Sequence, residues 1–234
     1  MSHLTVAKDS SAAMQSEAPL TARLAATITG TRKDDIPQPV RDKVSLCLLD
    51  FLSCAFEAHA LPWARQAAAL ATVGAGECTI VGTRKKVPAV DATFANAVAG
   101  HGLVREDMHT GSVSHLGVVV LPPLLALAEE RQVDGRAFTA AAVIGYEVGA
   151  RVGRALVTPE FTRTFRPTAF TCPLASAAPC SRLLNADAEI TANALALAAN
   201  MAGGQNEWPH TGGDEMFFHQ STRWRSWFVA SLSP

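Results

Sequence analysis

Apolar residues at helical spacing dominate this chain of 234 residues and most constrain its fold. The clearest stripe follows Asp34, Asp35 and Pro37, and consists of Val40, Val44, Cys47, Leu48, Phe51, Leu52 and Ala55. Acidic residues and proline are favoured where a helix begins, and such a stripe buries one helix face. This segment therefore predicts a capped, proline-started core helix.

The same criteria predict further helices along the chain. Their ranges are 20–30, 89–100, 117–131, Asp134 towards Leu156, about 168–184 and 188–201. Asp134 and Asp187 are expected to cap the helices that follow them, and Gly203-Gly204 to stop the last one. The residues of this last helix expected to pack inward are Ile190, Ala194, Leu195, Leu197 and Ala198.

Strand signals are almost missing, because Cys78–Val81 is the only short β-like run. We therefore predict an all-α, bundle-like fold without an internal repeat. The many alanines indicate close contact between helices, although helix propensity alone explains much of their abundance.

Charge and composition exclude several classes of protein. The 20 Lys and Arg residues balance 21 Asp and Glu residues, so we expect no nucleic-acid partner. The longest apolar run, Leu116–Leu127, contains two prolines and is too short to span a bilayer, so we expect no membrane partner. Five cysteines without a Cys-x-x-Cys pair indicate a reducing, cytoplasmic location. Residues 1–19 lack a secretory signature and are expected to form a disordered leader.

The densest group of titratable residues lies between two predicted helices, in residues 101–109 and at His115. Metal ligands could come from His101, Asp107, His109 and His115, but their spacing matches no compact zinc pattern, so no metal is expected. The simplest alternative is that these are ordinary loop residues that cap the neighbouring helices.

Seven segments resemble landmarks of the MmgE/PrpD family by their order and spacing. They read TRKDDIPQPVRDKVSLCLLDFLSCAF, GECTIVGT, DATFANAVAGHGL, EDMHTGSVSHLGVVVLPPLLALAE, GYEVGARVG, RPTAF and SRLLNADAEITANALALAANMAGG. The best-known members are 2-methylcitrate dehydratases, which act on small polycarboxylic acids. The resemblance implies a helical domain over residues 20–220, a lyase with a small polycarboxylate substrate, a homodimer, and no metal or cofactor. Family members continue into a smaller α/β domain, so a truncated protein is expected.

The resemblance also implies site residues. Glu106 and Asp107 match the family's acidic pair and His115 its pocket histidine, so Asp107 and His115 are the expected catalytic residues. The expected substrate-binding residues are His101, Arg105, Glu106, His109, Arg163, Arg166, His210 and His219. We expect Asp107, His115 and Arg166 to approach one pocket.

Three departures from the family pattern bear on the reaction. Val104 replaces an aspartate, Arg166 replaces a histidine that precedes Pro-Thr, and Met216 replaces a lysine. Arginine stays protonated, so it can bind a carboxylate but cannot act as a base. The alternatives to dehydration of 2-methylcitrate are decarboxylation, epimerisation of an amino or imino diacid, and a non-catalytic helical assembly domain.

The last segment, residues 221–234, breaks the resemblance. It contains two of the four tryptophans, which predicts a frameshifted tail, although an amphipathic terminal helix is the alternative.

Overall fold

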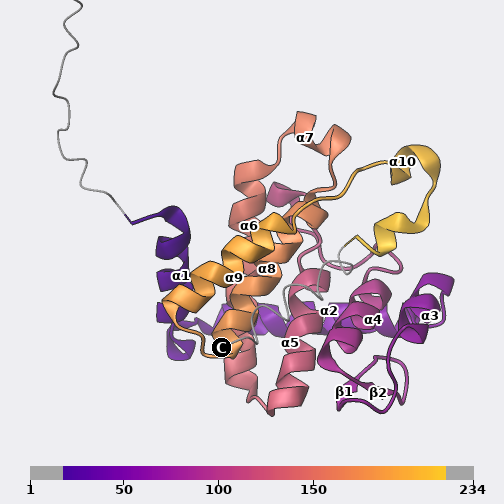
Figure 1. The fold of residues 1–234 in the computed structure, drawn as a ribbon, viewed down its shortest axis with the longest axis horizontal. Helices are drawn as coiled ribbons and strands as arrows, with labels where there is room; N and C mark the ends of the chain where they lie inside the picture. The colour runs from indigo at the N-terminus through magenta and orange to yellow at the C-terminus, as the bar shows by residue number, and fades with distance from the viewer. Residues whose placement is uncertain (1–17, 220–234) are drawn as a thin grey trace, which may run out of the picture.

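The computed structural model describes residues 18–219, and helices make up most of this part, which confirms the all-α prediction (Figure 1). The α-helices are α1 Leu20–Gly30, α2 Gln38–Ala58, α3 Pro62–Ala69, α4 Ala89–Gly100, α5 Gly117–Arg131, α6 Gly135–Leu156, α7 Pro159–Thr164, α8 Pro167–Leu183, α9 Ala188–Asn200 and α10 Trp208–Thr211. Three 3-10 helices are η1 Lys33–Asp35, η2 Thr110–Ser112 and η3 Asp214–Phe217. Strands β1 (Cys78–Thr79) and β2 (Lys86–Val87) form a short antiparallel pair.

The predictions for the leader and the tail fall almost wholly outside this part of the chain. Residues 1–17 and 220–234 are not among the described residues. The frameshift and disorder therefore stay predictions.

Local capping places the helix starts that the sequence predicted. Oδ1 of Asp134 accepts a hydrogen bond from the amide of Ala137 at 2.8 Å, and Oδ1 of Asp187 accepts one from the amide of Ile190 at 2.8 Å. The expected acidic cap of α2 is different, because Asp34 and Asp35 lie in η1 and Pro37 itself occupies the N-cap position without a side-chain hydrogen bond.

Two of the predicted inward residues of α9 are wrong. Ile190 and Leu197 are 46% and 48% exposed. The helix packs against α1 and α8 on a narrower face, which includes the buried Ala194, Leu195 and Ala198. Val40 in α2 is also exposed, because it lies in the first turn of that helix.

The helices form one packed group in which α6 and α8 make the most extensive contact (Figure 1). Helix α9 lies beside α8, and α1 beside α9. At the other end α4 packs against α3 and α5, next to the short β pair. Helices α4, α5 and α8 thereby bring three helix ends together, and these ends carry the candidate site.

Prolines inside α5 and α8 create contacts between elements. Proline has no amide hydrogen, so the carbonyl four residues earlier loses its helical partner. The carbonyl of Val119, four residues before Pro123, instead accepts a hydrogen bond from Oγ of Ser176 at 2.6 Å. The carbonyl of Ala169, four residues before Pro173, accepts one from the amide of Gly203 at 3.4 Å. The second contact ties the chain after α9 to the beginning of α8.

Within residues 18–219, no single helix is long and apolar enough to cross a membrane. Helices α2 and α3 have the required length and composition only as a pair, and they are bent by 93°.

Candidate functional site

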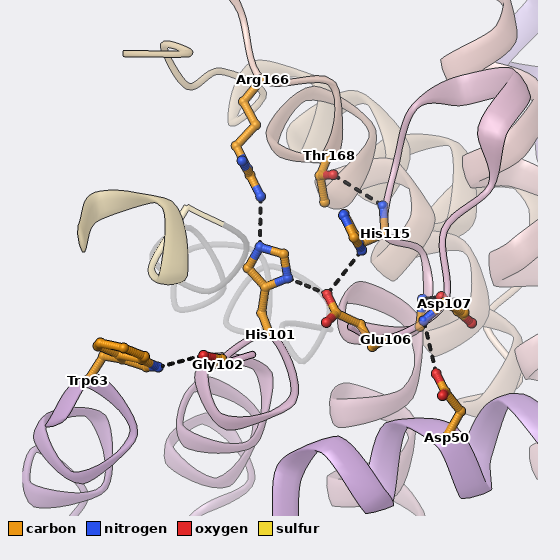
Figure 2. Close-up of polar contacts among 10 residues, drawn as sticks. Asp50, Trp63, His101, Gly102, Glu106, Asp107, His115, Arg166 and Thr168 are labelled. Carbon is orange, nitrogen blue, oxygen red and sulfur yellow. Dashed lines mark hydrogen bonds and ion pairs between the residues drawn. The ribbon is translucent and has the colours of Figure 1, made fainter. Parts of the chain in front are cut away.

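The candidate site lies where the end of α4 meets the beginnings of α5 and α8. His101 occupies the C-cap position of α4, His115 lies two residues before α5, and Arg166 occupies the N-cap position of α8. Glu106 comes from the loop between α4 and α5. Figure 2 shows these four side chains pointing toward one another. The fold therefore gathers residues that are up to 65 positions apart in the sequence.

A continuous chain of polar contacts joins the four side chains (Figure 2). Nη2 of Arg166 lies 2.7 Å from Nε2 of His101. Nδ1 of His101 is hydrogen-bonded to Oε1 of Glu106. Nδ1 of His115 lies 3.1 Å from the same carboxylate oxygen, off the line of a well-aligned hydrogen bond. Glu106 is thus shared by two histidines.

Burial makes these contacts strong and sets the protonation states. His101, Glu106 and Arg166 are all buried, and the side chain of His115 is 14% exposed. Burial raises the pKa of Glu106, but the hydrogen bond from His101 and the nearby ring of His115 outweigh it and lower the pKa to about 2. Burial lowers the pKa of His101, and Arg166 adds to this effect while Glu106 opposes it. At neutral pH the pair is therefore an ionised Glu106 and a neutral His101.

Arg166 is a buried cation that its neighbours only partly satisfy. Its Nε atom has no hydrogen-bond partner within the described residues, and the ring of Trp208 covers its guanidinium at 5.7 Å. Its amide donates to the carbonyl of Gly204 at 3.1 Å, which holds the residue against the segment after α9. Burial lowers the pKa of Arg166, and the charge of Glu106 opposes the shift. A guanidinium with an unpaired donor at the beginning of a helix favours an anionic ligand.

Aromatic and hydroxyl side chains hold the site residues in place. Oγ1 of Thr168 accepts a hydrogen bond from the amide of His115 at 3.2 Å. Nε1 of Trp63 donates to the carbonyl of Gly102 at 3.2 Å, directly after His101. Phe217 stacks on Trp63, with ring centroids 4.0 Å apart. The site is thus enclosed by α3 and η3 as well as by the three helix ends.

The carboxylate of Asp107 contacts different residues from those that Glu106 contacts. Its Oδ2 atom accepts a hydrogen bond from the hydroxyl of Tyr146 at 2.5 Å, and its Oδ1 atom accepts one from the amide of Gly117 at 2.8 Å. Burial and the charge of Asp107 raise the pKa of Tyr146, so its hydroxyl stays protonated. Asp107, Tyr146 and Cys47 line an open pocket of about 430 Å³. The structure joins His115 and Arg166 through His101 and Glu106, while the Asp107 carboxylate faces this pocket.

Two more predicted binding residues in the loop have partners outside the buried cluster. Arg105 is exposed and forms an ion pair with Glu57 on the surface. Nδ1 of His109 lies 2.9 Å from Oγ of Ser112, within its own loop. Neither side chain joins the buried cluster.

The remaining predicted binding residues lie on other elements. Arg163 is exposed in the last turn of α7, and His210 is exposed on α10. The ring of His219 is half-buried beside Gly204. A role for these three in binding stays a prediction.

The altered family positions occupy distinct environments. Val104 has a left-handed backbone with φ of 52°, and its side chain is 36% exposed. Aspartate tolerates this conformation better than a β-branched residue does, so valine here is strained. Met216 is buried in η3, beside Phe217 in sequence.

The ligand atoms of His101, Glu106 and His115 lie within 4.8 Å of one another, which is close enough for a metal site. The contact from Arg166 argues against this chemistry. A guanidinium can only donate, so Nε2 of His101 must be the acceptor and Nδ1 must carry the proton that a metal would have to replace. A cation would also be placed near a buried guanidinium. The donor set suits proton sharing better than metal binding.

Sequence reasoning missed the residues that support the site. Thr168 lies within the RPTAF landmark, so its proximity to Arg166 was a usable signal. No such signal marked Trp63 and Tyr146 in the sequence, because each forms its hydrogen bond with a residue 39 positions away along the chain. Such long-range contacts follow from helix packing and leave no local pattern.

Comparisons with known proteins identify the family of the chain. The family model of the MmgE/PrpD N-terminal domain matches residues 22–224. The chain is similar to the cis-aconitate decarboxylase-like protein oryM of Aspergillus oryzae, with 29% identity over 198 residues, which cover 80% of this chain and 41% of that protein. It is also similar to a cis-aconitate decarboxylase of Aspergillus terreus, with 26% identity over 144 residues, which cover 58% and 29% of the two chains. The chain thus spans less than half the length of these relatives, and it belongs to the MmgE/PrpD family.

Proposed function

We propose that this chain supplies the carboxylate-binding and proton-transfer groups of a lyase that acts on a small di- or tricarboxylic acid. The observation that carries this proposal is the convergence of Arg166, His101, Glu106 and His115 from three helix ends into one buried cluster. Surface residues that only cap helices would not be expected to form such a chain of contacts.

Arg166 is the proposed carboxylate anchor. Its unpaired Nε atom and its position at the beginning of α8 both favour an anion. Oε2 of Glu106 has no hydrogen-bond partner in the described part of the chain, so it is available to a hydrogen-bond donor.

His115 is the proposed proton-transfer residue. Its side chain is the most exposed of the cluster, and its Nδ1 atom lies 3.1 Å from Oε1 of Glu106. A proton can then pass between this ring and the carbon beside the bound carboxylate. Decarboxylation needs a proton delivered to carbon after carbon dioxide leaves, whereas dehydration needs a further acid to help hydroxide leave.

Neither Val104 nor Met216 can transfer a proton, which weakens the case for dehydration of 2-methylcitrate. Decarboxylation is the preferred reaction because the names of the two similar Aspergillus proteins are those of a cis-aconitate decarboxylase and a protein like it. Dehydration of 2-methylcitrate and epimerisation of an amino or imino diacid are the alternative reactions. A non-catalytic helical assembly domain is the alternative from another class.

Proton NMR in deuterated water tests the reaction. The purified chain is mixed separately with cis-aconitate, 2-methylcitrate and iminodisuccinate, so that decarboxylation, dehydration and proton exchange are all detected. We expect binding of cis-aconitate, seen as line broadening, and its loss in Arg166→Met. The matched control is Arg151→Gln, because Arg151 is an exposed arginine paired with Glu147 on α6. Equal binding by Arg166→Met and Arg151→Gln would contradict the proposed anchor.

We also propose that the protein is a homodimer that pairs through α2. Leu46, Leu49 and Phe56 are between 56% and 65% exposed, and their spacing places them on one face of this helix. Light scattering after size exclusion tests this. Leu46→Asp together with Leu49→Asp should convert a dimer to a monomer, and a wild-type monomer would refute the proposal.

A further inference from the structure

One residue in the buried cluster fixes the direction of every hydrogen bond in it. The guanidinium of Arg166 stays protonated and has donors only. Nε2 of His101, 2.7 Å from Nη2 of Arg166, must therefore accept. A neutral ring that accepts at Nε2 carries its proton on Nδ1.

The next contact continues in the same direction. Nδ1 of His101 donates its proton to Oε1 of Glu106, so this carboxylate oxygen is the acceptor. The lowered pKa of Glu106 and the lowered pKa of His101 both agree with this assignment. The cluster is thus a neutral histidine held between a fixed donor and a fixed acceptor.

The chain ends at His115. Its Nδ1 atom lies 3.1 Å from the same oxygen of Glu106. An unprotonated nitrogen at this distance would set its lone pair against a carboxylate lone pair, so the proton lies on Nδ1 even though the contact is not well aligned. Figure 2 shows the other ring nitrogen on the side of Thr168, away from Glu106.

We infer that His101 and Glu106 are positioning residues that hold His115 in its Nδ1–H tautomer. Arg166 sets which atoms donate and which accept in this chain of contacts, which we call the lock. Nε2 of His115 is then left as a free lone pair toward the ligand. The catalytic value of this arrangement rests on the proposed function, because a free Nε2 can take up a proton from solvent and then pass it to the ligand carbon while Glu106 holds the other ring nitrogen. The tautomer itself does not depend on any reaction.

Nitrogen-15 NMR of the histidine rings measures the tautomers directly. The full chain is labelled uniformly, and His101→Asn and His115→Asn assign two of its seven histidines. A neutral histidine in water prefers the Nε2–H form. We expect the Nδ1–H form of both His101 and His115 to exceed the other form by at least about fivefold at neutral pH, because the reverse leaves buried acceptors facing each other. A predominant Nε2–H form of His115 in the wild-type protein would overturn the inference without any variant.

Two substitutions test the separate parts of the lock. Glu106→Leu removes the acceptor, so His115 should return to the Nε2–H form. Arg166→Met removes the donor to Nε2 of His101, so the Nε2 resonance of His101 should shift, whereas Arg166→Lys should keep the wild-type pattern. An unchanged His101 signal in Arg166→Met, or an unchanged His115 signal in folded Glu106→Leu, would overturn the inference. If Glu106→Leu fails to fold, the wild-type spectrum and the Arg166 variants still decide.

The two proposals fail in different ways. Predicted tautomers without binding or turnover of any of the three acids would refute the proposed function and leave the lock in place. Binding that Arg166→Met abolishes, with His115 in the Nε2–H form, would support the carboxylate anchor and refute the lock.

Discussion

Helix α6 carries three glycines at four-residue spacing, and the last of them is tightly enclosed. A β-carbon at Gly153 would lie 2.3 Å from Cβ of Ser112 and 3.0 Å from Cγ2 of Thr171. Ser112 is fully buried in η2, so its β-carbon cannot turn aside as the end of a long side chain would. Gly153→Ala should therefore push η2 away from α6 and disturb the loop that precedes His115.

The expected loss of stability follows from two opposing effects. Overpacking of a core destabilises a protein by about 1–3 kcal/mol. Because the β-carbon of Ser112 cannot move aside, we expect the overpacking in Gly153→Ala to cost about 3 kcal/mol. Alanine gains about 1 kcal/mol over glycine inside a helix. The net loss is about 2 kcal/mol, which lowers the Tm of a domain of this size by about 4–8 °C.

Thermal unfolding followed by circular dichroism measures this effect. Gly135→Ala, at the first residue of the same helix, is the matched control, because a β-carbon there meets nothing within 4 Å. A second test uses Ser112→Gly, which removes the opposing β-carbon, so adding Gly153→Ala to it should cost little. A Tm of Gly153→Ala at or above the wild-type value would refute the packing argument.

Three other predictions concern the site and its loop. The pKa of His101 is lowered in the folded protein, so just below pH 6.5 only the unfolded state takes up a proton on this ring. As the pH is lowered through this range, the free energy of unfolding of the wild-type protein should therefore decrease by up to about 1.4 kcal/mol per pH unit. Urea unfolding should give a flatter profile for His101→Asn, and equal slopes would contradict this origin. Val104→Asn should raise the free energy of unfolding by about 1 kcal/mol in the same assay, because asparagine relieves the left-handed strain, and a lower value would show that valine packs usefully. The chain should show little or no dehydration of 2-methylcitrate in a proton NMR assay, and turnover at an ordinary enzymatic rate would refute this.

Local signals determined where most of the helices begin and end. Asp134 and Asp187 act as caps because a side chain three residues away from an amide needs no tertiary partner. Short helix α3 gave no such signal, since its eight residues expose a mixed surface and its buried positions are alanines. The exposure of Ile190 and Leu197 was also beyond local reasoning, because it depends on how wide a face the neighbouring helices cover.

The sequence by itself marked residues 101–115 and Arg166 as the parts of a site, through residue types and the order of family landmarks. The resemblance assigned the catalytic role to Asp107 and substrate binding to the adjacent Glu106, but it could not say where either carboxylate points. The structure sends the first carboxylate to His101 and His115 and the second to Tyr146 and Gly117. Two neighbouring side chains in a loop point in directions that the packed helices around them select, and this selection rests on contacts far apart along the chain.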